Sequence, residues 1–148
     1  MAAACEPDEK IRRFLARHHV LTLATVDGQG EAWCSNAFYA LDRQRALLVI
    51  ASNGETAHAA HMKAHCKVAA SVVLETRIVG RVQGCQIRGT ARQADDEARR
   101  CYLRRFPYAA AMSDAEFWAI GIDYVKLTDN TLGFGKKLIW QRDSDSEL

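Results

Sequence analysis

The strongest constraint on this chain is a series of short β-rich runs, each followed by residues that form turns. The runs cover residues 20–26, 31–41, 46–51, 67–76, 81–93, 117–127 and 132–140. Most are rich in β-branched and aromatic residues, which pack well on a pleated sheet. A few short helical segments interrupt them, but the regular βα alternation of a parallel sheet is missing. The pattern favours a mainly β fold with short helices, built as an antiparallel barrel.

Three helical segments are expected between these runs. Asp8 can cap the first, in which Ile11, Phe14, Leu15 and His18 share one face. The residues 52–56 have the turn and capping chemistry that precedes a second helix, which is expected to end near residue 65. Asp95 opens a third, whose inward residues are Ala98, Cys101, Tyr102 and Phe106, and Pro107 disturbs its end.

Length and charge favour a single small domain without a polyanionic partner. The 148 residues, 49% of them hydrophobic, fit one domain over residues 1–148, with 142–148 expected as a frayed polar tail. The net charge of +2 comes from interleaved signs, and the arginine pairs at 99–100 and 104–105 follow acidic residues. Nucleic-acid binding is therefore the weakest functional hypothesis.

The start of the chain and its cysteines indicate the cellular compartment. No basic and apolar leader precedes residue 10, and no apolar run approaches the roughly 18 to 20 residues of a membrane helix. The five cysteines include no CxxC pair, so reduced thiols are expected. We expect a cytoplasmic protein that does not contact membranes.

Two parts of the sequence resemble a known family. The runs HVLTLATVDGQG from residue 19 and WCSNAFY from residue 33, followed by residues 47–51, Thr56-Ala-His and Lys67-Val-Ala, resemble the first half of the pyridoxamine 5'-phosphate oxidase-like split barrels. The later run KLTDNTLGFGKKLIW (126–140), with Arg-Arg-Phe-Pro (104–107) before it, resembles the YhbP-like group of uncharacterised bacterial proteins. The resemblance implies a six-stranded antiparallel split β-barrel, a homodimer, and flavin mononucleotide (FMN) in two clefts between the subunits.

The function that this resemblance implies is FMN binding, with two alternatives for its use. The first is a flavin-dependent oxidoreductase of unknown small-molecule substrate. The second is a non-catalytic module that binds flavin or haem for storage, sensing or delivery. The fold by itself does not decide between them.

The phosphate of FMN is expected at the start of the second helix. A helix N-terminus offers free N–H groups and the positive end of its dipole. The resemblance places Thr56 and His58 in this role. The family commonly has arginine between them, where this chain has Ala57, so one bidentate donor is missing. An ordinary N-cap role for Thr56 stays open.

The flavin ring needs an apolar wall and backbone groups near its polar edge. The resemblance places Ser35, Asn36, Ala37 and Phe38 on that strand, with Asn36 where the family often has proline. For Phe38, core or rim packing is the alternative.

The late signature contributes two further candidates. Lys136 is a candidate for reaching phosphate across the dimer, and Trp140 for stacking on the ligand or sealing its cleft. The histidines at 58, 61 and 65 could share a helix face, but no carboxylate motif completes a site, so no metal is expected.

Overall fold

The computed structural model describes residues 6–143, which form a strongly twisted sheet with short helices around it. The strands are β1 (Val20–Val26), β2 (Ala32–Asp42), β3 (Leu47–Asn53), β4 (Lys67–Val73), β5 (Gln83–Gln93), β6 (Ala115–Asp129) and β7 (Lys137–Gln141). The α-helices are α1 (Glu9–Arg17), α2 (Ala57–Ala64) and α3 (Asp96–Arg105). Short 3-10 helices are η1 (Val79–Arg81), η2 (Pro107–Ala111) and η3 (Asn130–Leu132).

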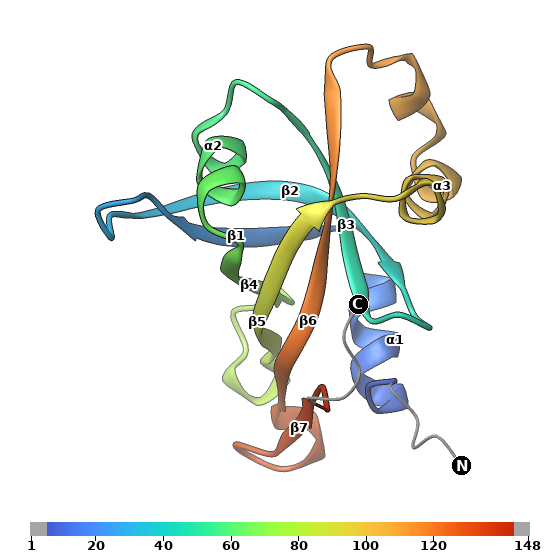
Figure 1. Cartoon of the computed structure of the whole chain (residues 1–148). Coiled ribbons are helices and arrows are strands. Elements are labelled where there is room, and N and C mark those ends of the chain that lie inside the picture. The colour runs from blue at the N-terminus through green and yellow to red at the C-terminus, as the bar shows by residue number, and fades with distance from the viewer. Residues whose placement is uncertain (1–5, 144–148) are drawn as a thin grey trace.

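Six of the strands close into an antiparallel barrel, as the sequence predicted (Figure 1). Their order is β3-β2-β1-β4-β5-β6, and β3 also pairs with β6, so the sheet returns on itself. Strand β6 makes this closure possible because its 15 residues pair with different neighbours along their length. Its first half pairs with β3, most of its length pairs with β5, and its end pairs with β7.

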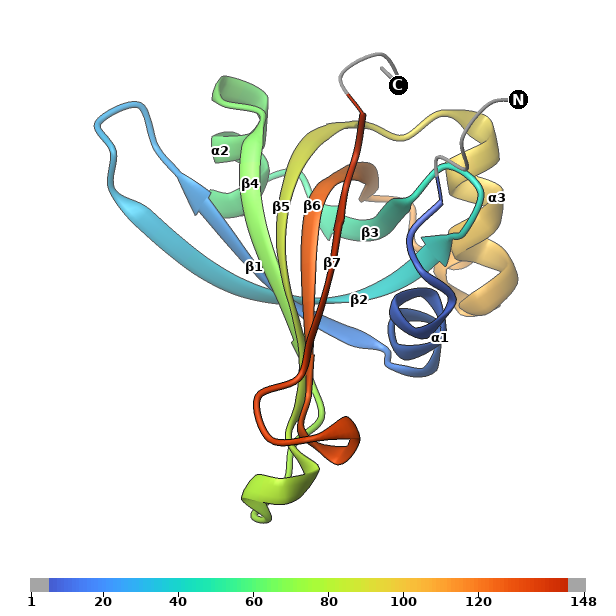
Figure 2. The same ribbon diagram turned by 90° about the horizontal axis from the view of Figure 1, so that it is seen from below.

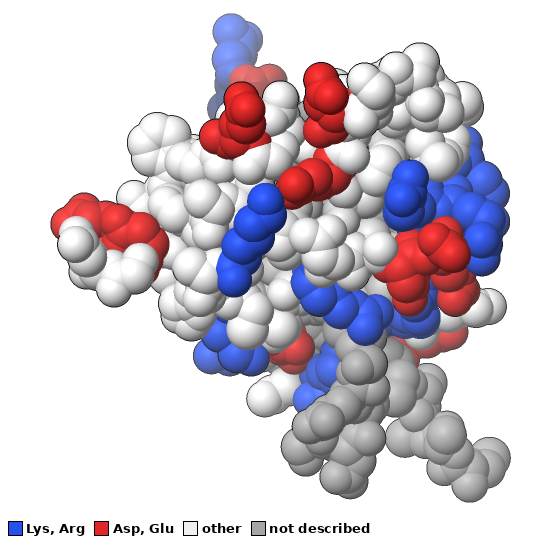
Figure 3. Space-filling model, turned by 45° about the horizontal axis from the view of Figure 1, so that its top comes forward, with Lys and Arg blue, Asp and Glu red and all other residues white. Residues whose placement is uncertain are grey.

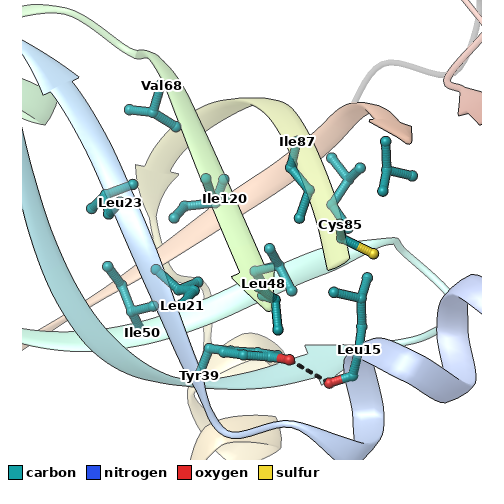
Figure 4. Close-up of a cluster of buried hydrophobic side chains, with 14 of the residues drawn as sticks. Leu15, Leu21, Leu23, Tyr39, Leu48, Ile50, Val68, Cys85, Ile87 and Ile120 are labelled. Atoms are coloured by element: carbon teal, nitrogen blue, oxygen red, sulfur yellow. Dashed lines mark hydrogen bonds between the residues drawn. The ribbon is translucent and has the colours of Figure 1, made fainter. Parts of the chain in front are cut away.

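Alternation along each strand decides which side chains form the core. On β1, Leu21, Leu23 and Thr25 point inward and are buried. Figure 4 shows Leu21 and Leu23 meeting side chains from β3, β5 and β6 inside the barrel. The hydroxyl of Tyr39 donates to the carbonyl of Leu15 over 2.5 Å, which anchors α1 to the barrel wall. Helix α1 thus packs on the barrel through the apolar face that the sequence predicted, since Ile11, Phe14 and Leu15 are buried in the core.

The late expected strand 132–140 is wrong in its first half. Residues 132–135 form the end of η3 and a loop, and β7 begins only at Lys137. Gly133 and Gly135 have φ values of 131° and 73°, which extended strands do not use. The side chain of Asn130 accepts a hydrogen bond from the Gly135 amide over 3.0 Å and stabilises this loop. The strands on either side of η1 are also shorter than expected. Strand β4 ends at residue 73 instead of 76, and β5 begins at residue 83 instead of 81.

The expected frayed tail 142–148 is wrong at its first residue, and residues 144–148 lie outside the described part. The Arg142 guanidinium donates to the carbonyls of Ile122, Arg45 and Ala46 at 2.9 to 3.1 Å. These bonds connect the end of β7 to the β2–β3 turn. Arg142 is therefore held in place by three backbone carbonyls, one of which, that of Ala46, also accepts from the Ile122 amide over 2.9 Å.

The cap of α3 provides a pH-dependent prediction. Asp95 accepts a hydrogen bond from the Ala98 amide over 2.9 Å and pairs with Arg45 over 2.7 Å. The Arg45 guanidinium, followed by the Ala98 amide, lowers the pKa of Asp95 well below its ordinary value of 3.8. Because the folded pKa lies below the unfolded one, the stabilisation is present above about pH 4 and disappears as the pH falls through the folded value.

Asp95→Asn keeps a good capping group but removes the charge. Thermal unfolding at pH 7 is expected to show a loss on the order of 1 kcal/mol, because the Asp95 side chain is half exposed and solvent screens the pair. The difference from the unmodified protein should shrink below pH 4. Asp8→Asn, at a helix cap without an ion pair among the described residues, is the control and should change stability less. A loss that is equal at pH 7 and pH 3 would contradict the charge argument.

Among residues 6–143, no helix is long and apolar enough to cross a bilayer.

Candidate functional site

The N-terminus of α2 is built to present backbone donors. Thr56 adopts an extended conformation, and its hydroxyl accepts from the Ala59 amide over 3.4 Å and donates to the Asn53 carbonyl over 2.8 Å. The amides of Ala57 and His58 have no acceptor within the described part of the chain. Two free N–H groups at the positive end of a helix are the arrangement that binds anions.

Two histidines lie on the first turns of the same helix. Half-buried His58 places its Nε2 atom 3.3 Å from the Thr56 hydroxyl. Burial, and then the charge of His61, lower the pKa of His58 below its ordinary value of 6.5. The Nδ1 atom of His61 lies 2.9 Å from the hydroxyl of Thr25, a buried residue of β1. Near neutral pH, His58 therefore offers a neutral imidazole rather than a cation.

The four candidates on β2 divide between the two faces of the sheet. Ser35 and Ala37 lie opposite Leu23 and Leu21 of β1 and share their inward face. The Ser35 hydroxyl is buried and has no hydrogen-bond partner among the described residues. A polar atom in this position usually has a bound water or ligand as its partner.

Asn36 and Phe38 point to the opposite, outer face of the barrel. The Asn36 side chain accepts from the Thr22 hydroxyl over 3.1 Å. Phe38 is 50% exposed, and its ring packs edge-on against Phe106 with centroids 5.7 Å apart. The alternation that separates these two residues from Ser35 and Ala37 is a direct consequence of the strand period.

The outer face of β2, β1 and β4 exposes several apolar side chains to solvent. We call it the outer sheet face, and define it by exposed or half-exposed small and apolar residues, which are Val20, Ala24, Cys34, Phe38, Ala69 and Val73. In the register these residues are cross-strand or near neighbours. A polar row of Thr22, Asn36 and Ser71 crosses this face between its apolar parts. Exposed apolar side chains gathered on one face, beside polar ones, are typical of an interaction site.

The far end of the barrel forms a projecting tip, which is made of η1 and η3 with their adjoining loops (Figure 2). The Asn130 side chain donates to the Val79 carbonyl over 2.8 Å and joins the two loops. The tip exposes four apolar side chains, which are Ile78, Val79, Leu132 and Phe134. It also carries four exposed cations, Arg77, Arg81, Lys136 and Lys137, and none of these has an ion pair among the described residues.

The two candidates from the late signature lie in different settings. Lys136 is exposed in the loop before β7, at the tip. Trp140 is half-buried opposite Val125, packs against the main core, and has the Arg142 guanidinium 5.6 Å from its ring centroid. The loop before β7, which contains Lys136, and helix α2 lie at opposite ends of the barrel (Figures 1 and 2). A single chain therefore does not bring Lys136 to Thr56 and His58.

The end of the molecule that carries α2 is acidic. Glu55 follows Gly54 in the β3–α2 turn, and Glu116 lies so close to Gly54 that a Cβ there would be 2.5 Å from its Oε1 atom. Lys63 pairs with Glu116 over 3.2 Å, but the second carboxylate oxygen is buried without a partner. Asp114 lines a neighbouring surface hollow with Asn53. Figure 3, with this end turned forward, shows acidic side chains gathered there.

Among residues 6–143, no group of three or more His, Cys, Asp or Glu side chains is placed to hold a metal ion. His65 lies at the C-cap of α2 rather than within the helix.

Sequence reasoning missed the Thr25–His61 contact and the joined tip. Period-two alternation from Leu21 and Leu23 could have placed Thr25 inside the barrel. The tip had no comparable signal, because η1 and η3 lie about 50 residues apart in the chain and are joined by one side chain.

Comparison with known proteins gives consistent matches over most of the chain. A family model described as pyridoxamine 5'-phosphate oxidase matches residues 7–129. A Salmonella paratyphi A relative, UPF0306 protein YhbP, is 45% identical over 141 residues, which cover 93% of this chain and 95% of the relative.

Solved structures share the fold at low sequence identity. A haem-binding protein from Mycobacterium smegmatis has a TM-score of 0.75 at 21% identity over 95% of this chain, and this chain spans 59% of that protein. A FAD-binding protein from Mesorhizobium loti has a TM-score of 0.66 at 17% identity, covering 78% of this chain and 87% of that protein.

Proposed function

Because the chain belongs to the pyridoxamine 5'-phosphate oxidase family, we propose that it binds FMN in clefts between the two subunits of a homodimer. The observation that carries the proposal is the pair of free amides at the start of α2. The FAD-binding neighbour adds support for a flavin in this fold.

The free amides at the start of α2 fit a phosphate, but one subunit does not supply enough positive charge beside them. The amides of Ala57 and His58, together with the imidazole of His58, can supply hydrogen-bond donors. Glu55 and Glu116 lie nearby, and position 57 carries no cation. A phosphate with about two negative charges at this position requires cations from elsewhere.

The basic tip of a second subunit supplies these cations in the proposed dimer. The outer sheet face is apolar enough to be an interface, and the two ends of the barrel have opposite charge. In the proposed dimer the two-fold axis crosses this face in the orientation that brings each basic tip to the acidic α2 end of the partner. Lys136 then approaches the phosphate, and the exposed apolar residues of the tip become covered.

The residues of β2 then have separate tasks. Asn36 and Phe38, on the outer face of β2, contact the flavin ring and the partner. Ser35 and Ala37 point into the barrel and form the part of the strand that backs the ring. Bound FMN would supply one- or two-electron transfer to a small molecule. Half-buried His58 orients the phosphate end as a neutral donor. Turnover with a nicotinamide donor would distinguish an oxidoreductase from a carrier.

Removing a donor from either end of the phosphate site is expected to weaken FMN binding. His58→Ala removes one neutral donor, and a few-fold increase in Kd is expected. Lys136→Ala removes a charged donor, and roughly a tenfold increase is expected. Flavin fluorescence titration of the purified protein gives both values. Light scattering beforehand is expected to give twice the chain mass of 16.5 kDa.

Arg100→Ala removes an exposed cation of α3, which belongs neither to α2 nor to the tip, and is the control that should leave the Kd unchanged. If His58→Ala and Lys136→Ala both bind FMN like the unmodified protein, the phosphate site is wrong. A monomer that binds FMN tightly would contradict the role of the tip.

Haem is the second candidate ligand, and the specific observation in its favour is the neutral, half-buried imidazole of His58. A neutral imidazole is the form that ligates iron. The Mycobacterium smegmatis neighbour is a haem-binding protein of the same fold. A Soret band on haem addition that His58→Ala removes, without flavin binding, would favour this candidate.

A further inference from the structure

A second polar site lies on the barrel wall and includes neither the N-terminus of α2 nor the tip. It is a groove of about 440 Å³ over the start of β4, the middle of β5 and β6, and the end of β7. Its lining residues are Lys67, Val68, Arg88, Gly89, Asp123, Tyr124 and Gln141. This volume lies within the range of small-molecule sites in proteins.

An irregularity in the sheet creates the groove. The β5–β6 register shifts between Arg88 and Gly89, so Asp123 has no partner residue on β5. The Arg142 amide holds the bulged backbone by donating to the Asp123 carbonyl over 2.8 Å. Bulges are common beside functional sites, because the extra residue re-aims a side chain.

The bulge places Asp123 in a short chain of hydrogen bonds. The Thr90 hydroxyl donates to its carboxylate over 2.7 Å, and Lys67 donates to the same hydroxyl over 3.1 Å. Lys67 thus has a neutral partner and retains two further N–H donors. Its charge is not matched by an ion pair among the described residues.

Arg88 is the second cation of the groove and is already oriented. Its guanidinium carbon lies 4.6 Å from the centroid of the Tyr124 ring. No carboxylate within the described part of the chain pairs with it. Lys67 pairs with Thr90 and Ala69 with Arg88 in the register, so the two cations are diagonal neighbours on adjacent strands.

We propose that this groove binds a small oxyanion, the carboxylate or phosphate group of a metabolite, between Arg88 and Lys67. The planar fork of Arg88, held against Tyr124, matches the two oxygens of such a group. Lys67 supplies a second charged donor. Asp123 accepts a hydroxyl or amino hydrogen from the rest of the ligand, which makes the site selective for molecules with a donor beside the anionic group. The groove shares no lining residue with the proposed phosphate site, although Ala69 of the outer sheet face lies beside Arg88.

The test is a titration of the full chain with inorganic phosphate or succinate at constant ionic strength, without FMN. The chemical shifts of the Gly89 and Tyr124 amides are followed by NMR. Saturable shifts in the millimolar range are expected for at least one anion. A response to phosphate alone identifies a phosphate ligand, and a response to succinate alone identifies a carboxylate.

Variants locate the response. Arg88→Gln and Lys67→Gln should each weaken it at least fivefold. Arg99→Gln is the matched control, because Arg99 also lies over an aromatic ring, 5.0 Å from Phe117, but outside the groove. It should change the Kd less than twofold. Linear shifts without saturation, or equal losses in Arg88→Gln and Arg99→Gln, would overturn the proposal.

Discussion

Replacing Gly89 with alanine is expected to lower the free energy of unfolding by about 3 kcal/mol, the upper part of the range for overpacked cores. A Cβ at this buried position would lie 2.7 Å from Cγ2 of Ile120 and 2.8 Å from the carbonyl oxygen of Gly121. The second contact is with backbone, so the β5–β6 pair itself must move. For a chain of this size the melting temperature should fall by roughly 10 °C.

Gly80→Ala is the matched control for this substitution. A Cβ at residue 80 meets nothing within 4 Å, and the backbone there has no positive φ. Its stability should stay within about 0.5 kcal/mol or rise slightly, because alanine reduces the entropy of the unfolded chain. Chemical denaturation gives the free energy of unfolding of both variants and tests the expected difference between them. Similar stabilities would show that β6 moves away from residue 89 at little cost.

Replacing Ala57 with arginine is expected to tighten FMN binding about tenfold, which corresponds to about 1.4 kcal/mol. Ala57 is exposed and is the first residue of α2, beside the free amides. A guanidinium at this position adds the bidentate, charged donor that the site lacks. It would also reduce the dependence of binding on Lys136 of the partner. Fluorescence titration of FMN at fixed ionic strength measures the change.

Ala64→Arg adds the same charge to the same helix, but at its exposed C-terminal end. It should leave the Kd within about twofold, since phosphate is expected at the N-terminus. Equal gains in both variants would indicate a general charge effect. No gain from Ala57→Arg would place the phosphate elsewhere.

Much of the candidate site was accessible from local sequence patterns. Thr56 was expected to cap a helix, and it does so because its side chain needs only neighbouring backbone groups. Ser35 and Asn36 point to opposite faces of the sheet because successive side chains alternate along a strand. The strand expected at residues 132–140 was wrong in its first half, because two glycines with positive φ form a loop that alternation does not reveal.

The sequence by itself determined the types of element, their order and the side of each strand that is buried. These depend on capping and alternation among residues that are close in the chain. Only the tertiary structure decided that β3 pairs with β6, that Asn130 joins the two loops of the tip, and that a bulge places Asp123 beside Thr90. Each of these depends on residues about 30 to 70 positions apart. Their meeting follows from closure of the whole barrel, which no local pattern contains.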